Sequence, residues 1–132
     1  MKSGLIFGAL ALSLAPAWVV SASAQADVAN GQTQFNQKCA NCHSLSADPA
    51  HGAMGPNLMG VIGRTAGTIE GWNFSPALKE SKLVLTEENL SKWLTDPEAL
   101  VPGTMMTVKV PNRFEREDLI GYIKKATADA KK

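Results

Sequence analysis

A five-residue motif constrains this chain more than any other feature. Residues 39–43 read Cys-Ala-Asn-Cys-His and contain the only two cysteines of the 132-residue chain. A disulfide across so short a loop would gain little chain entropy. A redox-active cysteine pair needs no adjacent histidine and usually sits in a βαβ setting. Zinc prefers four ligands, and only His51 is on offer as the fourth.

The spacing matches instead the pattern that attaches haem of the c type through two thioether bonds. Cys39 and Cys42 can each bond one vinyl group of the haem, and His43 then lies over the iron, where its Nε2 can coordinate. Its Nδ1–H then needs an acceptor that fixes the ring. One motif predicts one covalently bound haem c. The candidates for the sixth iron ligand are Met54, Met59, Met105, Met106 and His51.

The first 24 residues have the order of an export signal. Lys2 is followed by an apolar run over residues 5–20 and by small residues at 21–24. We expect cleavage after Ala24, with Ala26 as a second cleavage site. Retention as an N-terminal anchor is the alternative, although the run is short for a bilayer span of about 20 residues. The chain is therefore expected to comprise a signal peptide (1–24) and one domain (25–132) located in the bacterial periplasm.

Composition excludes several classes of protein. The chain has 13 basic and 12 acidic residues, and loss of Lys2 leaves 12 against 12. A nucleic-acid-binding protein would usually show a basic excess. Hydrophobic residues make up 45%, which argues against disorder. A domain of this size with long Gly- and Pro-rich loops buries little apolar surface of its own, so a large apolar group is expected at its centre.

The sequence predicts four helical stretches and shows no convincing strand alternation, which makes the fold all-α. Residues 44–71 keep no regular period and are expected to form loops. The expected helices are one over 28–40 capped by Asp27, one from the cap Thr86 to about Leu94, a short one at Pro97, and a C-terminal one capped by Asn112 with Glu115 as reciprocal partner. The apolar stripe of the last helix comprises Leu119, Ile120, Tyr122 and Ile123.

Beyond the cysteine motif, the chain resembles the class I cytochromes c, both the mitochondrial type and the bacterial periplasmic type. Residues 101–106 read Val-Pro-Gly-Thr-Met-Met and are similar to the Pro-Gly-Thr-x-Met loop of that family, whose last methionine binds iron. The resemblance implies that Met106 is the sixth ligand and that Met105 is the variable residue. It also implies the cytochrome c fold, with four or five helices, long loops around one haem, and crossed terminal helices.

Further matches imply roles for individual residues. Residues 55–58 (Gly-Pro-Asn-Leu) resemble the loop whose proline carbonyl accepts from the ligand histidine, which gives that role to Pro56. Arg64 stands where an arginine lies near a haem propionate. Trp93 occupies the position of a tyrosine that contacts the methionine ligand, and it can donate only through Nε1–H. The first and last helices are expected to touch at Gly31, Phe35, Leu119 and Tyr122.

The chain also departs from the family. Three positions near the haem that are usually polar are apolar here, namely Phe74, Leu78 and Leu85. Where mitochondrial members carry lysines around the haem edge, this chain has Glu98, Ala99 and Met105. A more apolar docking surface is therefore expected, formed by Val101, Met105 and Val108.

The remaining residues are expected to have structural roles. His51 is expected to bond to loop backbone rather than to iron. Met54 and Met59 are expected to fill gaps in the loops. Phe114 is expected to pack under the C-terminal helix.

The expected function is single-electron transfer rather than catalysis. With His43 and Met106 both bound, the iron keeps no free position, and no catalytic side-chain pair or phosphate loop is apparent. We expect a monomeric carrier between a donor (a quinol-oxidising complex or a dehydrogenase) and a terminal oxidase or reductase. It would touch the membrane only transiently or through an uncleaved leader. The alternatives are a haem catalyst or gas-binding sensor with a labile Met106, or a dedicated electron-transfer subunit of a periplasmic dehydrogenase.

Overall fold

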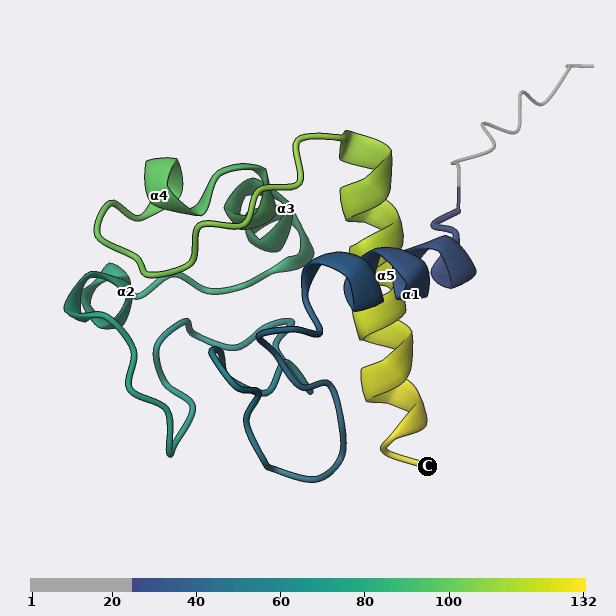
Figure 1. Ribbon diagram of the computed structural model, residues 1–132, viewed down its shortest axis with the longest axis horizontal. Helices are drawn as coiled ribbons and strands as arrows, with labels where there is room; N and C mark the ends of the chain where they lie inside the picture. Colours follow the sequence, from purple (N-terminus) through teal and green to yellow (C-terminus); the bar gives the residue numbers. More distant parts are fainter. Residues whose placement is uncertain (1–24) are drawn as a thin grey trace, which may run out of the picture.

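The computed structural model describes residues 25–132, which form five helices joined by long loops (Figure 1). The helices are α1 (Val28–Lys38), α2 (Pro76–Ser81), α3 (Glu87–Thr95), α4 (Pro97–Leu100) and α5 (Arg113–Asp129). Within these residues the β pairing is one isolated bridge between Thr65 and Val84, and none of the five helices is long and apolar enough to cross a bilayer. The all-α prediction is confirmed. The proposed signal peptide at 1–24 lies outside the described residues.

The helices begin where side-chain oxygens can accept from free backbone N–H groups. The caps of α1, α3, α4 and α5 are Asp27, Thr86, Asp96 and Asn112. Helix α2 was missed by the sequence analysis, although Ser75 as cap and Pro76 in the first turn are a recognisable start signal. The reciprocal contact expected of Glu115 was wrong, because its carboxylate accepts from Lys38 Nζ at 2.5 Å instead.

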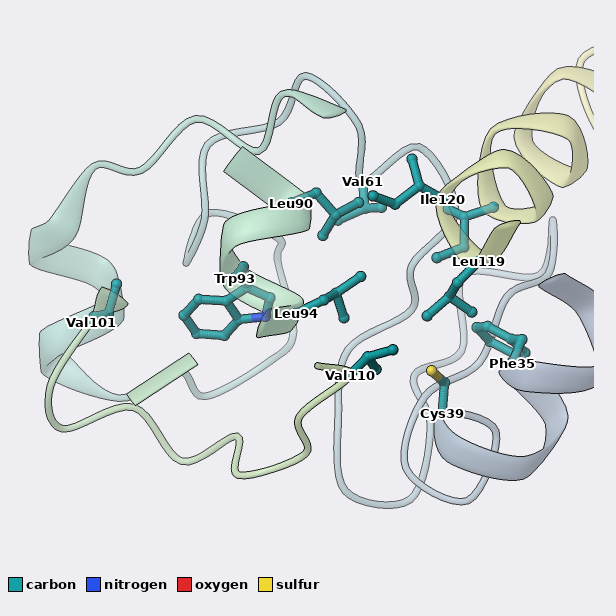
Figure 2. Close-up of a cluster of buried hydrophobic side chains, with 11 residues drawn as sticks. Phe35, Cys39, Val61, Leu90, Trp93, Leu94, Val101, Val110, Leu119 and Ile120 are labelled. Atoms are coloured by element: carbon teal, nitrogen blue, oxygen red, sulfur yellow. The ribbon is translucent and has the colours of Figure 1, made fainter. Parts of the chain in front are cut away.

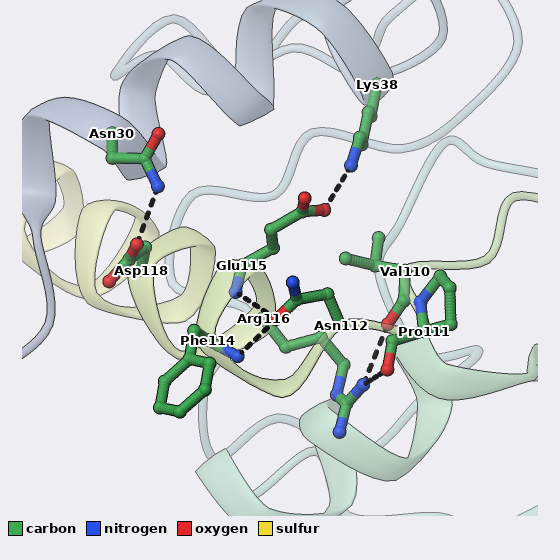
Figure 3. Close-up of polar contacts among 9 residues, drawn as sticks. All are labelled: Asn30, Lys38, Val110, Pro111, Asn112, Phe114, Glu115, Arg116 and Asp118. Atoms are coloured by element: carbon green, nitrogen blue, oxygen red, sulfur yellow. Dashed lines mark hydrogen bonds and ion pairs between the residues drawn. The ribbon is translucent and has the colours of Figure 1, made fainter.

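Helices α1 and α5 cross, as predicted (Figure 1). The backbones approach so closely at Gly31 that a Cβ there would lie 2.0 Å from the carbonyl oxygen of Asp118. The rings of Phe35 and Tyr122 pack beside this contact, with centroids 5.6 Å apart. The Asp118 carboxylate also accepts from the backbone N–H of Asp27 at 2.7 Å. It accepts from Asn30 Nδ2 at 2.7 Å as well (Figure 3). The last helix therefore helps to cap the first.

The hydrophobic core extends from this crossing to α3 (Figure 2). Leu119 of α5 and Val110 in the preceding loop are fully buried, and Trp93 and Leu94 of α3 join them. Phe114 does not pack under α5 as expected. It is 66% exposed, because the apolar stripe of α5 faces the core from Leu119 onwards and the first turn lies outside it.

Candidate haem site

A cavity of about 360 Å³ lies among the loops and helices, and its walls are largely apolar. Cys39, Cys42, His43 and Met106 all line it. The first three follow α1, whereas Met106 comes from the long loop between α4 and α5. The fold thus brings the two cysteines and both candidate iron ligands to one cavity.

The end of α1 shapes the cysteine motif. Cys39 caps the helix, and its carbonyl accepts from the backbone N–H groups of Cys42 at 3.0 Å and His43 at 2.9 Å. The two sulfurs form no disulfide. Burial raises the pKa of the Cys39 thiol to about 11, although the charge of Lys38 opposes this shift. The Cys39 sulfur is therefore uncharged at neutral pH.

The imidazole of His43 is held in one orientation. Its Nδ1 lies 2.8 Å from the carbonyl oxygen of Pro56, and because a carbonyl can only accept, Nδ1 carries the hydrogen. Burial lowers the pKa of His43, while the bond to Pro56 acts in the opposite direction. Gly55 leaves room for the ring, since a Cβ there would lie 2.4 to 2.9 Å from its atoms. A neutral ring with hydrogen on Nδ1 offers the Nε2 lone pair to a metal.

Asn57, which sequence reasoning did not single out, organises the loop that carries Pro56. Its side chain is 4% exposed. Its amide nitrogen donates to the carbonyls of Ser46 at 3.0 Å and Asp48 at 2.7 Å, and its oxygen accepts from the backbone N–H of Met59 at 2.9 Å. These three bonds replace the regular secondary structure that this segment lacks, and they fix the position of Pro56.

His51 joins the same loop to a more distant one. Its Nδ1 accepts from the backbone N–H of Asn57 at 3.1 Å, and its Nε2 donates to the carbonyl of Glu70 at 2.9 Å. The ring also packs edge-on against Trp72, with centroids 5.6 Å apart. Both ring nitrogens are thus engaged with backbone, which confirms the expectation for His51.

On the other loop, Met105 and Met106 both line the cavity, and Met106 is the one that is partly buried. Its sulfur accepts from Trp93 Nε1–H at 3.2 Å, and its side chain packs against the hydrophobic core. Met105 is 66% exposed. The thioether sulfur has two lone pairs, and the bond from Trp93 engages one of them. The other remains for a metal.

Arg64 also lines the cavity, together with the three apolar residues Phe74, Leu78 and Leu85. One guanidinium nitrogen of Arg64 donates to the carbonyl of Met59 at 2.5 Å, and burial lowers the pKa of the guanidinium. None of the carboxylates within residues 25–132 forms an ion pair with it. Of the two cations that line the mostly apolar cavity, Lys38 is paired with Glu115, whereas Arg64 has no carboxylate partner within residues 25–132.

The residues present fit a haem. The cavity combines apolar walls for a macrocycle with two free cysteines, a neutral histidine and a thioether sulfur. Imidazole and thioether are established axial ligands of haem iron. The donor set lacks the four ligands of a structural zinc site, because His51 is bonded to backbone elsewhere.

Comparison with known proteins agrees with this site. The family model for cytochrome c matches residues 28–127. The chain is 42% identical to cytochrome c2 of Blastochloris viridis, over 97% of both chains. It is 40% identical to cytochrome c of Sesamum indicum and 41% identical to that of Chlamydomonas reinhardtii. Each of these two matches covers 77% of this chain, and 92% and 91% of the relatives.

The match covers every part of the chain that builds the cavity, from α1 through α5. The two cysteines are the only ones in the chain, so covalent attachment of the haem has to use them. This chain belongs to the cytochrome c family and is a monohaem electron carrier with covalently bound haem c.

Proposed function

We propose that this chain carries single electrons in a periplasmic respiratory chain, with haem attached at Cys39 and Cys42 and iron bound by His43 and Met106. The observation that carries the proposal is that both axial candidates line one cavity and each is held by a hydrogen bond that leaves a lone pair for iron. Bound haem supplies an iron that takes up and releases one electron. Because the protein's own hydrogen bonds hold His43 and Met106, binding of both to iron would need little rearrangement when an electron is exchanged.

The surrounding residues would support this group in distinct ways. The Pro56 carbonyl would keep His43 oriented and raise its basicity. Trp93 would hold the Met106 sulfur through its N–H. Arg64, which lacks a carboxylate partner within residues 25–132, would offset the charge of a haem propionate, since a buried carboxylate needs such a partner.

The length of the matches supports export to the periplasm. The similarity to the bacterial cytochrome c2 spans 97% of this chain, which is too much to leave out the 24 residues of the proposed signal peptide. The plant and algal matches cover 77%. A monomeric periplasmic carrier would take electrons from a quinol-oxidising complex or a dehydrogenase and deliver them to a terminal oxidase or reductase.

Expression of the full chain with its leader tests attachment and processing together. We expect a pyridine haemochrome typical of two thioether bonds, a mass increased by one haem, and a mature N-terminus at Gln25 or Asp27. Cys42→Ala should leave one thioether and little holoprotein. A colourless exported protein, or pigment extracted by acidic acetone, would contradict the proposal.

The two adjacent methionines provide a matched test of the sixth ligand. Met106→Ala should abolish the far-red band typical of a methionine–ferric iron bond, lower the potential, and open the iron to carbon monoxide. Met105→Ala should leave the band and the potential unchanged, because this side chain is 66% exposed. Ready binding of carbon monoxide by the reduced unsubstituted protein would favour the gas-binding or catalytic alternative and sink the carrier proposal.

A further inference from the structure

Three exposed apolar side chains lie among the residues that line the haem cavity. Met54 is 68% exposed, Met105 66% and Val108 36%. We call these three residues the mouth patch. Two expectations from the sequence were wrong. Val101 is 7% exposed and packs in the core instead of forming part of the docking surface, and Met54 is exposed instead of filling a gap in the loops. The mouth patch therefore combines one residue from the loop before Pro56 with two from the loop of Met106.

Three cations are already engaged: the two in the cavity lining and the lysine next in sequence to Val108. Lys38, which lines the cavity, donates to Glu115 at 2.5 Å (Figure 3). Lys109, next in sequence to Val108, donates to Asp96 at 2.7 Å. The other cation of the cavity lining, Arg64, is bonded to a backbone carbonyl.

This pairing determines which partner charges the mouth patch can accommodate. An acidic partner would have to break an ion pair to gain Lys38 or Lys109. It would also meet Glu98, an exposed carboxylate at the start of α4, beside the Met106 loop. Electrostatic steering by a basic surface is therefore weak at the mouth patch. What the surface offers instead is apolar side chains, two of the three being methionines, whose flexibility lets them adapt to different contacts.

We propose that the mouth patch docks a redox protein whose contact surface is apolar and carries no acidic cluster. This inference rests on the proposed electron-carrier function and names the kind of partner that it requires. Electrons would enter and leave where the apolar patch meets the haem cavity. Because apolar contacts are not screened by ions, exchange would be nearly independent of salt concentration.

Gold electrodes coated with alkanethiols imitate the two kinds of partner. One coating ends in methyl and hydroxyl groups, and the other ends in carboxylates. For the holoprotein we expect faster electron exchange on the methyl coating. The rate there should change less than about twofold between about 0.01 and 1 M salt, over which the Debye length falls from about 30 to 3 Å. Faster exchange on carboxylates that collapses as salt is added would overturn the inference.

Two variants provide matched controls, because Met105 and Phe114 are both 66% exposed and only Met105 lines the cavity. Met105→Ser should slow exchange on the methyl coating at least about fivefold, the usual minimum for a significant interface residue. Phe114→Ser should leave it unchanged. Equal losses for both variants, or no loss for Met105→Ser, would contradict the mouth patch.

The failure of this inference is distinguishable from failure of the proposed function. The far-red methionine–iron band is recorded on the same sample before it meets the electrode. A protein that shows the band and prefers carboxylates is an electron carrier with a different docking surface. A protein that lacks the band contradicts the carrier proposal and, with it, the inference that rests on it.

Discussion

The two loops that hold the candidate iron ligands differ in how they are stabilised. The loop that orients His43 is cross-linked along its length by Asn57 and His51, whose side chains bond to backbone at five places. The Met106 loop has few such hydrogen bonds between side chains and backbone. Within it the structure shows a backbone bond from Thr104 to Val101 and a long contact of 3.5 Å from the Met106 N–H to Thr104 Oγ1.

The Met106 loop is instead fastened at its ends. At its start, the buried Val101 donates to the carbonyl of Pro97 at 2.9 Å. At its end, Val110 donates to the carbonyl of Leu94 at 2.7 Å, and Arg116 donates to the carbonyls of Val110 and Pro111 (Figure 3). The polypeptide thus fixes the candidate nitrogen ligand, His43, by its own hydrogen bonds, whereas the candidate sulfur ligand, Met106, depends on a few contacts, chiefly with Trp93.

The largest expected effect comes from Gly55→Ala. The new Cβ would lie 2.4 Å from Cε1 and 2.5 Å from Nδ1 of His43, so the ring or its loop has to move. Overpacking against a ring that is already held by Pro56 should cost about 3 kcal/mol. Denaturant unfolding of the holoprotein measures this loss, with Met54→Ala as the neighbouring control because Met54 is exposed. Equal stability of the two variants would show that the ring is not confined.

Asn57→Ala should have the next largest effect. It removes one acceptor and two donors from a side chain that is 4% exposed, so three backbone groups lose their partner. We expect a loss of about 2 kcal/mol in the free energy of unfolding. The matched change on the other loop, Thr104→Val, should cost much less because its contact is long. Similar losses at the two sites would remove the contrast between the loops.

Trp93→Phe should weaken only the sulfur side. It removes the hydrogen bond to Met106 Sδ and should lower the stability of the methionine–iron contact by about 1 kcal/mol. Thermal titration of the far-red band, compared with global unfolding followed by circular dichroism, separates the two events. We expect the band to be lost at a lower temperature than in the parent protein. A shift in global unfolding alone would assign Trp93 a packing role.

The smallest effect is expected at the ion pair between Lys109 and Asp96. The hydrogen bond from Lys109, followed by backbone bonds that include Ala99, holds the pKa of Asp96 below its ordinary value. A lowered carboxyl pKa stabilises the fold above the unfolded pKa near 3.8, and this contribution disappears as pH falls through the folded pKa. Lys109→Gln should raise the Asp96 pKa measured by NMR. An unchanged pKa would show that the pair does not form in solution.

The features predicted correctly from sequence are mostly local. The cysteine motif lies within five residues, and the caps at Asp27, Thr86 and Asn112 act on their own first turns. Because these interactions join residues close together in the chain, they can be predicted without knowledge of the fold. The Pro56 carbonyl and the crossing at Gly31 were implied by family resemblance, and the structure shows both contacts.

What the sequence could not supply depends on partners that are distant in the chain. Glu115 has a suitable position for a capping box, but Lys38 of α1 approaches it from 77 positions away. Val101 follows α4 and packs in the core, whereas Phe114, in the first turn of α5, lies outside the core cluster. Asn57 has no pattern in sequence that distinguishes it from an ordinary loop asparagine.

The carboxylate of Asp118 has a consequence for how the molecule is assembled. It bonds to the backbone of Asp27, 91 positions earlier, so the first helix gains this contact and its packing partner only when the C-terminal helix is present. Such high contact order slows folding. The cysteines at the end of that helix thus belong to a segment whose packing is completed only when the two ends of the domain meet.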